Sequence, residues 1–257
     1  MLNKVKKYRL VLAVVGAALL QACTTVPHPE PIDPWEGMNR DILAFNDEAD
    51  RVVLKPVARG YQLLTPTFVD IGISNFFSNL KDVGVSINNF LQAKPKQGSM
   101  DVARFLVNST VGIAGFVDVA ALIDLPKHEE DFGQTLAVWG VPRGPYFVLP
   151  FYGPSSVRGT GGRIGDMALH PLTYTVLFAN PAVGWGAFGA RAVEVIDIRA
   201  DFLAVEAVAS EAAVDRYVFF RSAYMQRRDY LINDGAAQPL ELDDLDDLDE
   251  SLYEDLE

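Results

Sequence analysis

The sequence is poor in the residues that build most catalytic and metal sites. It holds one cysteine, Cys23, and three histidines among its 257 residues. One cysteine excludes an internal disulfide. The histidines, His28, His128 and His170, are too scattered for a zinc motif such as HExxH, and the G-x-S-x-G turn of serine hydrolases is missing. We therefore expect no metal, no cofactor and no enzymatic activity.

Positive charge is also scarce. Lysine and arginine number 22 against 34 acids, so the formal charge is −12. Such a surface would repel nucleic-acid phosphates, which argues against a nucleic-acid partner. The charge is uneven, because residues 1–9 hold four bases and residues 241–257 hold ten acids and no base.

Long hydrophobic runs are missing, apart from one near the start. The apolar run Leu10 to Leu20 is too short to span a bilayer but has the length of a signal-peptide core. The sequence LQAC that ends at Cys23 resembles a bacterial lipobox, although a secretory signal with a chance cysteine is the alternative. We expect residues 1–22 to be a signal peptide and Cys23 to carry lipid. By resemblance to enterobacterial lipoproteins, Thr24 in place of Asp favours the outer membrane.

The two ends of the mature chain differ from its middle. Residues 23–34 are rich in proline, which predicts an extended tether between the lipid anchor and a folded domain. Residues 236–257 form an acidic tail that we expect to be disordered, because like charges repel. Its leucines recur three and four residues apart, so a helix that forms on a partner is the alternative. A helical domain over residues 35–235 remains between them.

Apolar periodicity in that middle part predicts helices. The clearest stripe has spacings of three and four and predicts one long amphipathic helix, facing either the core or a membrane interface: Val69, Ile73, Phe76, Leu80, Val83, Ile87 and Phe90. Asp33 and Ser99 have the chemistry of N-caps. Further helices are expected over 57–64, 100–111, 116–122, 135–139 and 211–231. No alternating strand pattern is evident.

The stretch 132–166 is apolar, aromatic and interrupted by glycine and proline throughout. It cannot be one helix, because proline removes a donor and clashes with the preceding turn. It is also too apolar for a solvated loop, so it must pack against something or line something. The glycines of 159–165 do not fit a dinucleotide fingerprint, because the third required position is Ile164.

Several ordered blocks of the sequence resemble the MlaA/VacJ family of lipoproteins. These blocks are DPWEGMNR at 33–40, SNFFSNL at 74–80, RFLVNST at 104–110, FGQTL at 132–136, LPFYG at 149–153 and RSAYMQRR at 221–228. Two positions depart from the usual pattern. Gly159 follows Arg158 where many members have Asp, and Pro142-Arg143 stands where a small or glycine-rich pair is common.

The resemblance implies an all-α fold: a ring-like arrangement of amphipathic helices with a Gly/Pro-rich irregular segment, lying in a membrane leaflet. It implies an outer-membrane lipoprotein on the periplasmic face that removes misplaced phospholipid from the outer leaflet through an amphipathic channel. The implied partners are phospholipids, a trimeric porin and an MlaC-like periplasmic carrier. The residues expected along the lipid path are Trp139, Tyr146, Leu149 and Phe151 beside the tails and Arg158 or Arg163 beside the phosphate. The alternative for the aromatics is ordinary core.

Two other functions are compatible with the residues. A structural lipoprotein would tether a porin or another envelope partner through the acidic tail. A periplasmic lipid hydrolase would release fatty acid, although no nucleophile motif supports it.

Overall fold

The computed structural model describes residues 32–178, 180–212 and 215–235. Four of the sequence features above therefore lie wholly or mostly outside the described residues: the signal peptide 1–22, Cys23, the tether 23–34 up to residue 31, and the tail 236–257.

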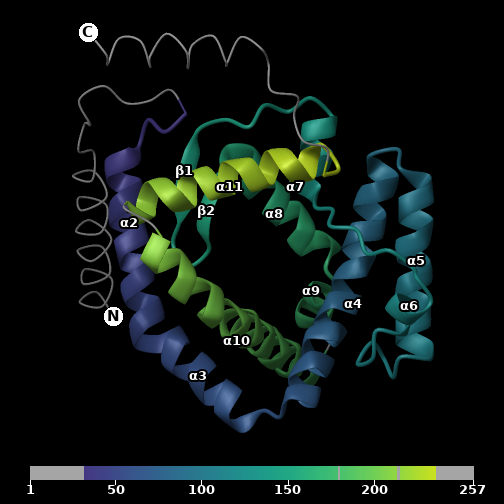
Figure 1. The fold of residues 1–257 in the computed structure, drawn as a ribbon. Helices are drawn as coiled ribbons and strands as arrows, with labels where there is room; N and C mark the ends of the chain where they lie inside the picture. The colour runs from purple at the N-terminus through teal and green to yellow at the C-terminus, as the bar shows by residue number, and fades with distance from the viewer. Residues whose placement is uncertain (1–31, 179, 213–214, 236–257) are drawn as a thin grey trace, which may run out of the picture.

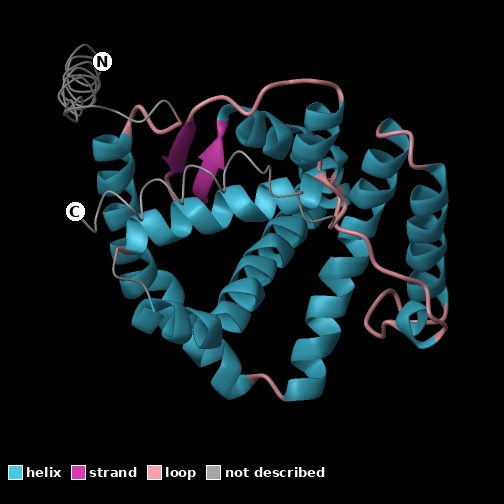
Figure 2. Cartoon of the chain, turned by 45° about the horizontal axis from the view of Figure 1, so that its top comes forward, coloured by secondary structure: helices cyan, strands magenta, loops and turns pink. Residues whose placement is uncertain are grey.

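The described chain is almost entirely helical, which confirms the all-α prediction (Figures 1 and 2). The one exception is a hairpin of two short strands. In chain order the elements are α2 (Glu36–Ala49), a π-helical turn (Asp50–Leu54), α3 (Lys55–Leu64), α4 (Thr67–Leu91), α5 (Pro95–Thr110), α6 (Val119–Leu122), α7 (Phe132–Val138), β1 (Tyr146–Leu149), β2 (Gly153–Ser156), α8 (Val157–Leu169), α9 (Pro171–Phe178), α10 (Pro181–Ala212) and α11 (Arg216–Ile232).

The long helices follow one another around a central opening (Figure 1). Helices α2 and α3 form one side, α4 the next, and α8, α10 and α11 complete the circuit. Helices α5 and α6 pack on the outer side of α4, away from the opening. The helices thus surround the middle of the molecule.

Pro56 bends the chain without ending the helix. Proline has no N–H to donate to the carbonyl of Val52, which lies four residues earlier. The chain passes through π-helical turns over Asp50–Leu54 and continues as α3. π-Turns of this kind accommodate an interruption of the regular ladder.

Three predicted details of the helices are wrong. Asp33 is not an N-cap, because α2 begins at Glu36 and the Asp33 carboxylate is buried, where it accepts hydrogen bonds from Asn39 and Tyr217. Ser99 lies inside α5, whose first residue is Pro95. The expected helix 116–122 shortens to α6, which the Asp118 side chain caps through the Ala121 N–H.

The expectation of no strands is also wrong. Tyr146 to Leu149 pairs antiparallel with Gly153 to Ser156 inside the Gly/Pro-rich stretch. Two asparagines of α2 satisfy the open edge of β1: Asn39 accepts from the Val148 N–H at 2.9 Å, and Asn46 donates to the Leu149 carbonyl at 2.9 Å. Exposed strand edges need such partners. These partners lie about a hundred residues away in sequence, so no local pattern indicates them.

Burial in the described residues is inverted relative to an ordinary globular core. The buried set contains 18 polar or charged residues and nine hydrophobic ones, while 41 large hydrophobic residues are exposed. Helix α4 shows the inversion clearly. Its buried residues include Asn79, Asp82, Asn88 and Asn89, whereas Phe90 of the apolar stripe is 47% exposed. The other six residues of the apolar stripe are half-buried, so the core and a membrane interface both stay predictions for this stripe.

Candidate functional site

The central opening contains a cavity of about 880 Å³. Its walls come from the inner sides of α4, α8, α10 and α11 and from the segment before α7. Both acids and bases line it, from Lys81 and Asp82 on α4 to Arg191 and Asp197 on α10. Apolar side chains, among them Phe77, Val85 and Ile198, line it between the charged groups. A cavity of this size with both kinds of wall suits an amphipathic molecule that carries a charged or zwitterionic group.

The α4 and α10 walls are joined by polar side chains. Lys81 Nζ lies 3.3 Å from Glu194, and Arg191 lies 2.5 Å from the same carboxylate. Three residues further along α10, Asp197 accepts hydrogen bonds from Ser74 at 2.9 Å and from Tyr61 of α3 at 2.8 Å. These contacts hold α10 against α3 and α4 while leaving charged groups along the cavity.

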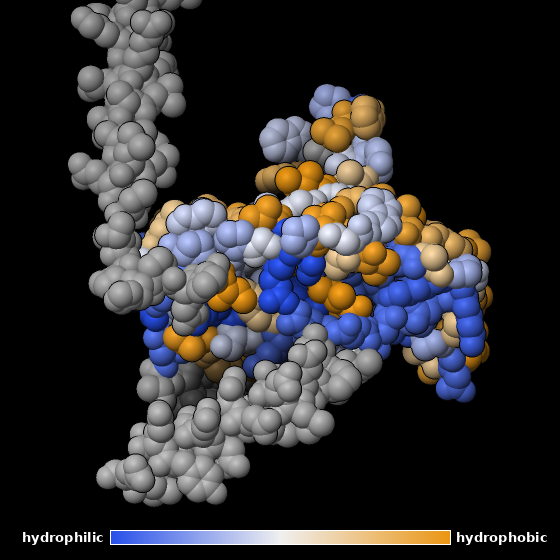
Figure 3. Space-filling view, turned by 90° about the horizontal axis from the view of Figure 1, so that it is seen from above, coloured by the Kyte–Doolittle hydropathy of each residue, from blue (hydrophilic) through white to orange (hydrophobic). Residues whose placement is uncertain are grey.

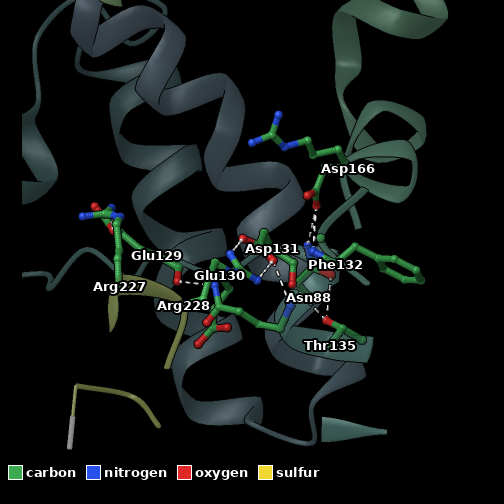
Figure 4. A network of polar contacts seen from close by, with 12 residues as sticks. Asn88, Glu129, Glu130, Asp131, Phe132, Thr135, Asp166, Arg227 and Arg228 are labelled. Atoms are coloured by element: carbon green, nitrogen blue, oxygen red, sulfur yellow. Dashed lines mark hydrogen bonds and ion pairs between the residues drawn. The ribbon is translucent and has the colours of Figure 1, made fainter. Parts of the chain in front are cut away.

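A second network closes the opposite side of the cavity (Figure 4). Asp131 caps α7 by accepting from the Gln134 N–H at 2.8 Å, and Arg228 of α11 pairs with the same carboxylate. Asp166 of α8 accepts from the Phe132 N–H at 2.8 Å. Helices α7, α8 and α11 therefore meet through two carboxylates that flank the start of α7.

Asn88 extends this network to α4. It donates to Asp166 at 3.3 Å and accepts from the Thr135 hydroxyl at 2.8 Å (Figure 4). At the rim, Arg227 pairs with Glu129 at 2.7 Å, and both side chains are mostly exposed. Such an exposed pair contributes little to stability. The hydrogen bonds of Asn88 to Asp166 and Thr135 therefore contribute more to holding α4, α7 and α8 together.

The two carboxylates of this network have opposite pKa shifts. Burial raises the pKa of Asp166 to about 6, with a further contribution from neighbouring Asp131. Burial also acts on Asp131, but the Arg228 guanidinium and the Gln134 N–H hold the pKa of Asp131 below its usual value. Because the Arg228 guanidinium pairs with Asp131, the pKa values of these two neighbouring carboxyls shift in opposite directions.

Glycines explain how α7 and α8 come so close. A Cβ placed on Gly162 would lie 2.5 Å from the backbone of Gly133. The glycine cluster that does not fit a dinucleotide fingerprint therefore has a packing role here, because two helix backbones touch at this point.

The outer surface is apolar over large areas. At the α3–α4 corner Leu63 is 86% exposed and Phe68 is 71% exposed, and near the α9–α10 turn Phe178 is 78% exposed. Viewed from above, apolar residues gather along the upper margin, and hydrophilic residues form a band beneath them (Figure 3). Exposed apolar areas of this extent mark interaction with a membrane or a protein.

The six residues predicted along the lipid path are dispersed. Arg163 lines the cavity and donates to the Pro154 carbonyl at 3.0 Å. Arg158 donates to the Val141 carbonyl outside the cavity, and burial together with nearby Arg143 lowers its pKa.

The four apolar candidates lie away from the cavity walls. Tyr146 is fully buried in the core with Val148 and Tyr217, as the alternative for the aromatics expects. Leu149 is half-buried, and its carbonyl accepts from Asn46. Trp139 and Phe151 are exposed on the outer surface.

The principal cavity residues on α10 escaped the sequence analysis. Their spacing carried a signal, because Arg191, Glu194, Asp197 and Asp201 recur every three or four residues and share one helix face. The polar face of α4, which supplies Ser74, Ser78 and Lys81, was visible in the sequence as a mild polar stripe. Neither pattern showed that the two helices face each other.

Two kinds of site were not found in the part of the chain that the structure describes. No helix there combines the length and apolarity needed to cross a membrane. No group of three or more potential ligands there is arranged to hold a metal ion.

The chain is similar to known lipoproteins over most of its length. Residues 31–231 match the MlaA lipoprotein family. The intermembrane phospholipid transport system lipoprotein MlaA of Shigella flexneri is 35% identical, over 95% of this chain and 99% of that protein. The Escherichia coli K12 protein of the same name is 34% identical over the same shares, and the Haemophilus influenzae one is 31% identical over 90% and 92%.

A solved structure agrees with these matches. It concerns the structural basis for maintenance of bacterial outer membrane lipid asymmetry and superposes with a TM-score of 0.67 at 35% identity, covering 78% of this chain and 98% of that one. The sequence match and the shared fold agree, and the chain belongs to the MlaA lipoprotein family.

Proposed function

We propose that the chain is the lipoprotein of an intermembrane phospholipid transport system and helps to maintain lipid asymmetry in the outer membrane. The names of its relatives and the subject of the similar structure support this role. The single observation that carries it is the inverted distribution of polarity. Charged residues line the cavity, and apolar residues cover much of the outer surface.

The physical argument is that a phospholipid has two incompatible halves. A headgroup that crosses a hydrocarbon layer without polar contacts loses its hydration at a cost of several kcal/mol per ion. A cavity with charged walls offers replacement contacts, while apolar outer helices let the protein lie within a leaflet. The chain provides both the charged cavity walls and the apolar outer helices on one ring. Lipid movement along such a ring needs no chemical step, so we propose a non-enzymatic role.

Placement and partners are part of the same proposal. Lipidation of Cys23 anchors the chain to the periplasmic face of the outer membrane, where the ring lies in the inner leaflet. A trimeric porin holds it there, and an MlaC-like carrier accepts the extracted phospholipid in the periplasm. The resemblance to the family and the exposed apolar residues of α3, α4 and α9 support this placement.

The decisive experiment uses a strain that lacks this gene. Phospholipid in the outer leaflet of the outer membrane is quantified, with the wild-type gene and Cys23→Ser as rescue. We expect phospholipid to accumulate in the deletion strain and only the lipidated protein to restore asymmetry. Unchanged asymmetry in the deletion strain contradicts the proposal. Fatty acid release by the purified protein would instead indicate a hydrolase.

A further inference from the structure

Helix α10 separates opposite charges along its inner face. Arg191, Glu194, Asp197 and Asp201 all line the cavity at spacings of three, three and four residues. At 1.5 Å per residue, the level of Glu194 and that of Asp197 are about 4.5 Å apart along the helix axis. The two levels differ in charge. Cations gather at the level of Glu194, and carboxylates gather at the level of Asp197.

The cationic level has more positive than negative charge. Lys81 and Arg191 both pair with Glu194, so two permanent cations share one carboxylate. Glu194 is 3% exposed, whereas Lys81 and Arg191 are 48% and 42% exposed. His170 lies 3.4 Å from Arg191, and burial and then Arg191 itself lower its pKa, which favours the neutral ring. One net positive charge is therefore available to an anionic group in the cavity.

The acidic level lacks a balancing cation. Asp197 is 3% exposed and accepts hydrogen bonds from Tyr61 and Ser74, which are both neutral. Among the described residues no base pairs with Asp197. Asp201 lies one turn further along α10, and burial and then the carboxylates of Asp197 and Asp70 raise its pKa.

Buried carboxylates are normally paired with a cation, because an isolated buried charge is costly. Asp70 adds to the anomaly, since its Oδ1 atom is buried without a hydrogen-bond partner among the described residues. The cavity wall therefore has excess positive charge at the level of Glu194 and a buried carboxylate without a cation at the level of Asp197. A zwitterion with its anionic group at the first level and its cationic group at the second would complement this wall.

We propose, on the basis of the phospholipid transport above, that this wall binds the headgroup of a zwitterionic amino-phospholipid. Lys81 and Arg191 bind the phosphate, and Asp197 binds the primary ammonium. The two-carbon link between phosphate and amine in a phosphoethanolamine headgroup is comparable in length to the step between the two levels. A glycerol headgroup has no cation to offer Asp197, so the wall favours the amine-bearing lipid.

The test uses the purified full-length lipoprotein in detergent. The protein is mixed with equal amounts of phosphatidylethanolamine and phosphatidylglycerol, and both bound lipids are quantified by mass spectrometry. The variants are Lys81→Gln and Asp197→Asn, which keep the size of each side chain. Lys96→Gln is the matched control, because it removes an exposed cation that lies outside the cavity. A thermal melt of each variant checks that it is folded.

For Asp197→Asn we expect the ratio of bound phosphatidylethanolamine to phosphatidylglycerol to fall about tenfold, because one charge-assisted contact is lost. For Lys81→Gln we expect both lipids to bind about tenfold more weakly with an unchanged ratio. Lys96→Gln should match the wild type. A folded Asp197→Asn protein with the wild-type ratio, or Lys81→Gln with wild-type binding, overturns the proposal.

Two further results separate the possible failures. If the wild type binds phospholipid and neither variant changes it, this site is wrong and the transport proposal is unaffected. If the wild type binds no phospholipid, both proposals fail. Soluble glycerophosphoethanolamine serves as a competitor, and we expect it to displace lipid only at a large excess, because it lacks tails. Equal potency of this soluble compound contradicts a lipid site.

Discussion

Two regions of the molecule differ in the residues that they bury. Where the β-hairpin meets α2 and α11, Tyr146, Val148 and Tyr217 form an apolar core, and asparagine side chains close the strand edge. Across the ring, the wall formed by α4 and α10 buries Asp197 and Glu194 together with Phe77, and many apolar residues of α10 are exposed. The same chain thus contains a core typical of water-soluble proteins and a wall with reversed polarity.

This difference separates two tasks. The hairpin core gives the ring a rigid, sequence-specific joint, because close packing allows little rearrangement. The α4–α10 wall gives up apolar burial to keep charged groups along the cavity. Stability and transport therefore depend on different residues, and four comparisons of variants test that separation, in order of decreasing effect.

The largest loss of stability is expected from Tyr146→Ala. The ring of Tyr146 is buried and lies 6.2 Å from the ring of Tyr217 and 6.0 Å from that of Tyr224. Removing it leaves a cavity and should lower the free energy of unfolding by about 3–5 kcal/mol. Thermal melts in detergent measure the change. Tyr152→Ala, on the exposed side of the same hairpin, should stay within about 0.5 kcal/mol. Equal losses would mean that the hairpin core is not the rigid joint.

A smaller loss is expected from Gly162→Ala, where α7 and α8 touch. The new methyl group meets the backbone of Gly133, which cannot rotate away, so the helices must separate at a cost of about 2 kcal/mol. Gly161→Ala is the matched control. Its methyl group makes an ordinary contact 3.7 Å from Leu136, and alanine favours the helix by about 1 kcal/mol. Chemical denaturation of both variants gives the difference, and similar values would rule out the proposed close approach.

A pH-dependent effect is expected from Asp166→Asn. Burial raises the folded-state pKa of Asp166 to about 6, so the folded protein binds the proton more tightly than the unfolded chain does. The stability that this group contributes is therefore complete at about pH 4 and falls as the pH rises to about 6. Asparagine does not titrate, so the melting temperature of the variant relative to wild type should rise between these values.

Asp131→Asn provides the comparison of opposite sign. Its pKa is lowered in the folded protein, so its contribution is present above the unfolded value and is lost as the pH falls through the folded one. The melting temperature of this variant relative to wild type should therefore drop as the pH rises. Parallel pH profiles for the two variants would contradict the opposite pKa shifts of Asp166 and Asp131.

The smallest effect on stability is expected from Leu63→Ser, because Leu63 is 86% exposed. Its free energy of unfolding should change by less than about 0.5 kcal/mol. Membrane affinity should fall by about 1–2 kcal/mol, because an apolar side chain is lost from the surface that we propose to contact lipid. Vesicle flotation in a Cys23→Ser background removes the anchor from the measurement, and Thr67→Ser is the neutral control. Unchanged flotation argues against this corner as a membrane contact.

Much of the helical framework was predictable. The stripe from Val69 to Phe90 lies within α4, and the segment 57–64 lies within α3, because periodicity is a local property of the chain. The ordered blocks from 33 to 228 identified the family. Of the six predicted path residues, Arg163 alone lines the cavity, because apolarity in a sequence does not show whether a residue faces a core, a lipid or a cavity.

The sequence by itself determined many of the helices, that residues 132–166 could not form one continuous helix, and the family to which the chain belongs. These features depend on spacing, on proline geometry and on ordered motifs, all of which are readable along the chain. The tertiary structure alone decided that Asn39 and Asn46 complete a strand edge, that Gly162 meets Gly133, and that α10 presents its charges to α4. Each of these depends on contacts between distant segments, whose energies exist only once the ring has closed.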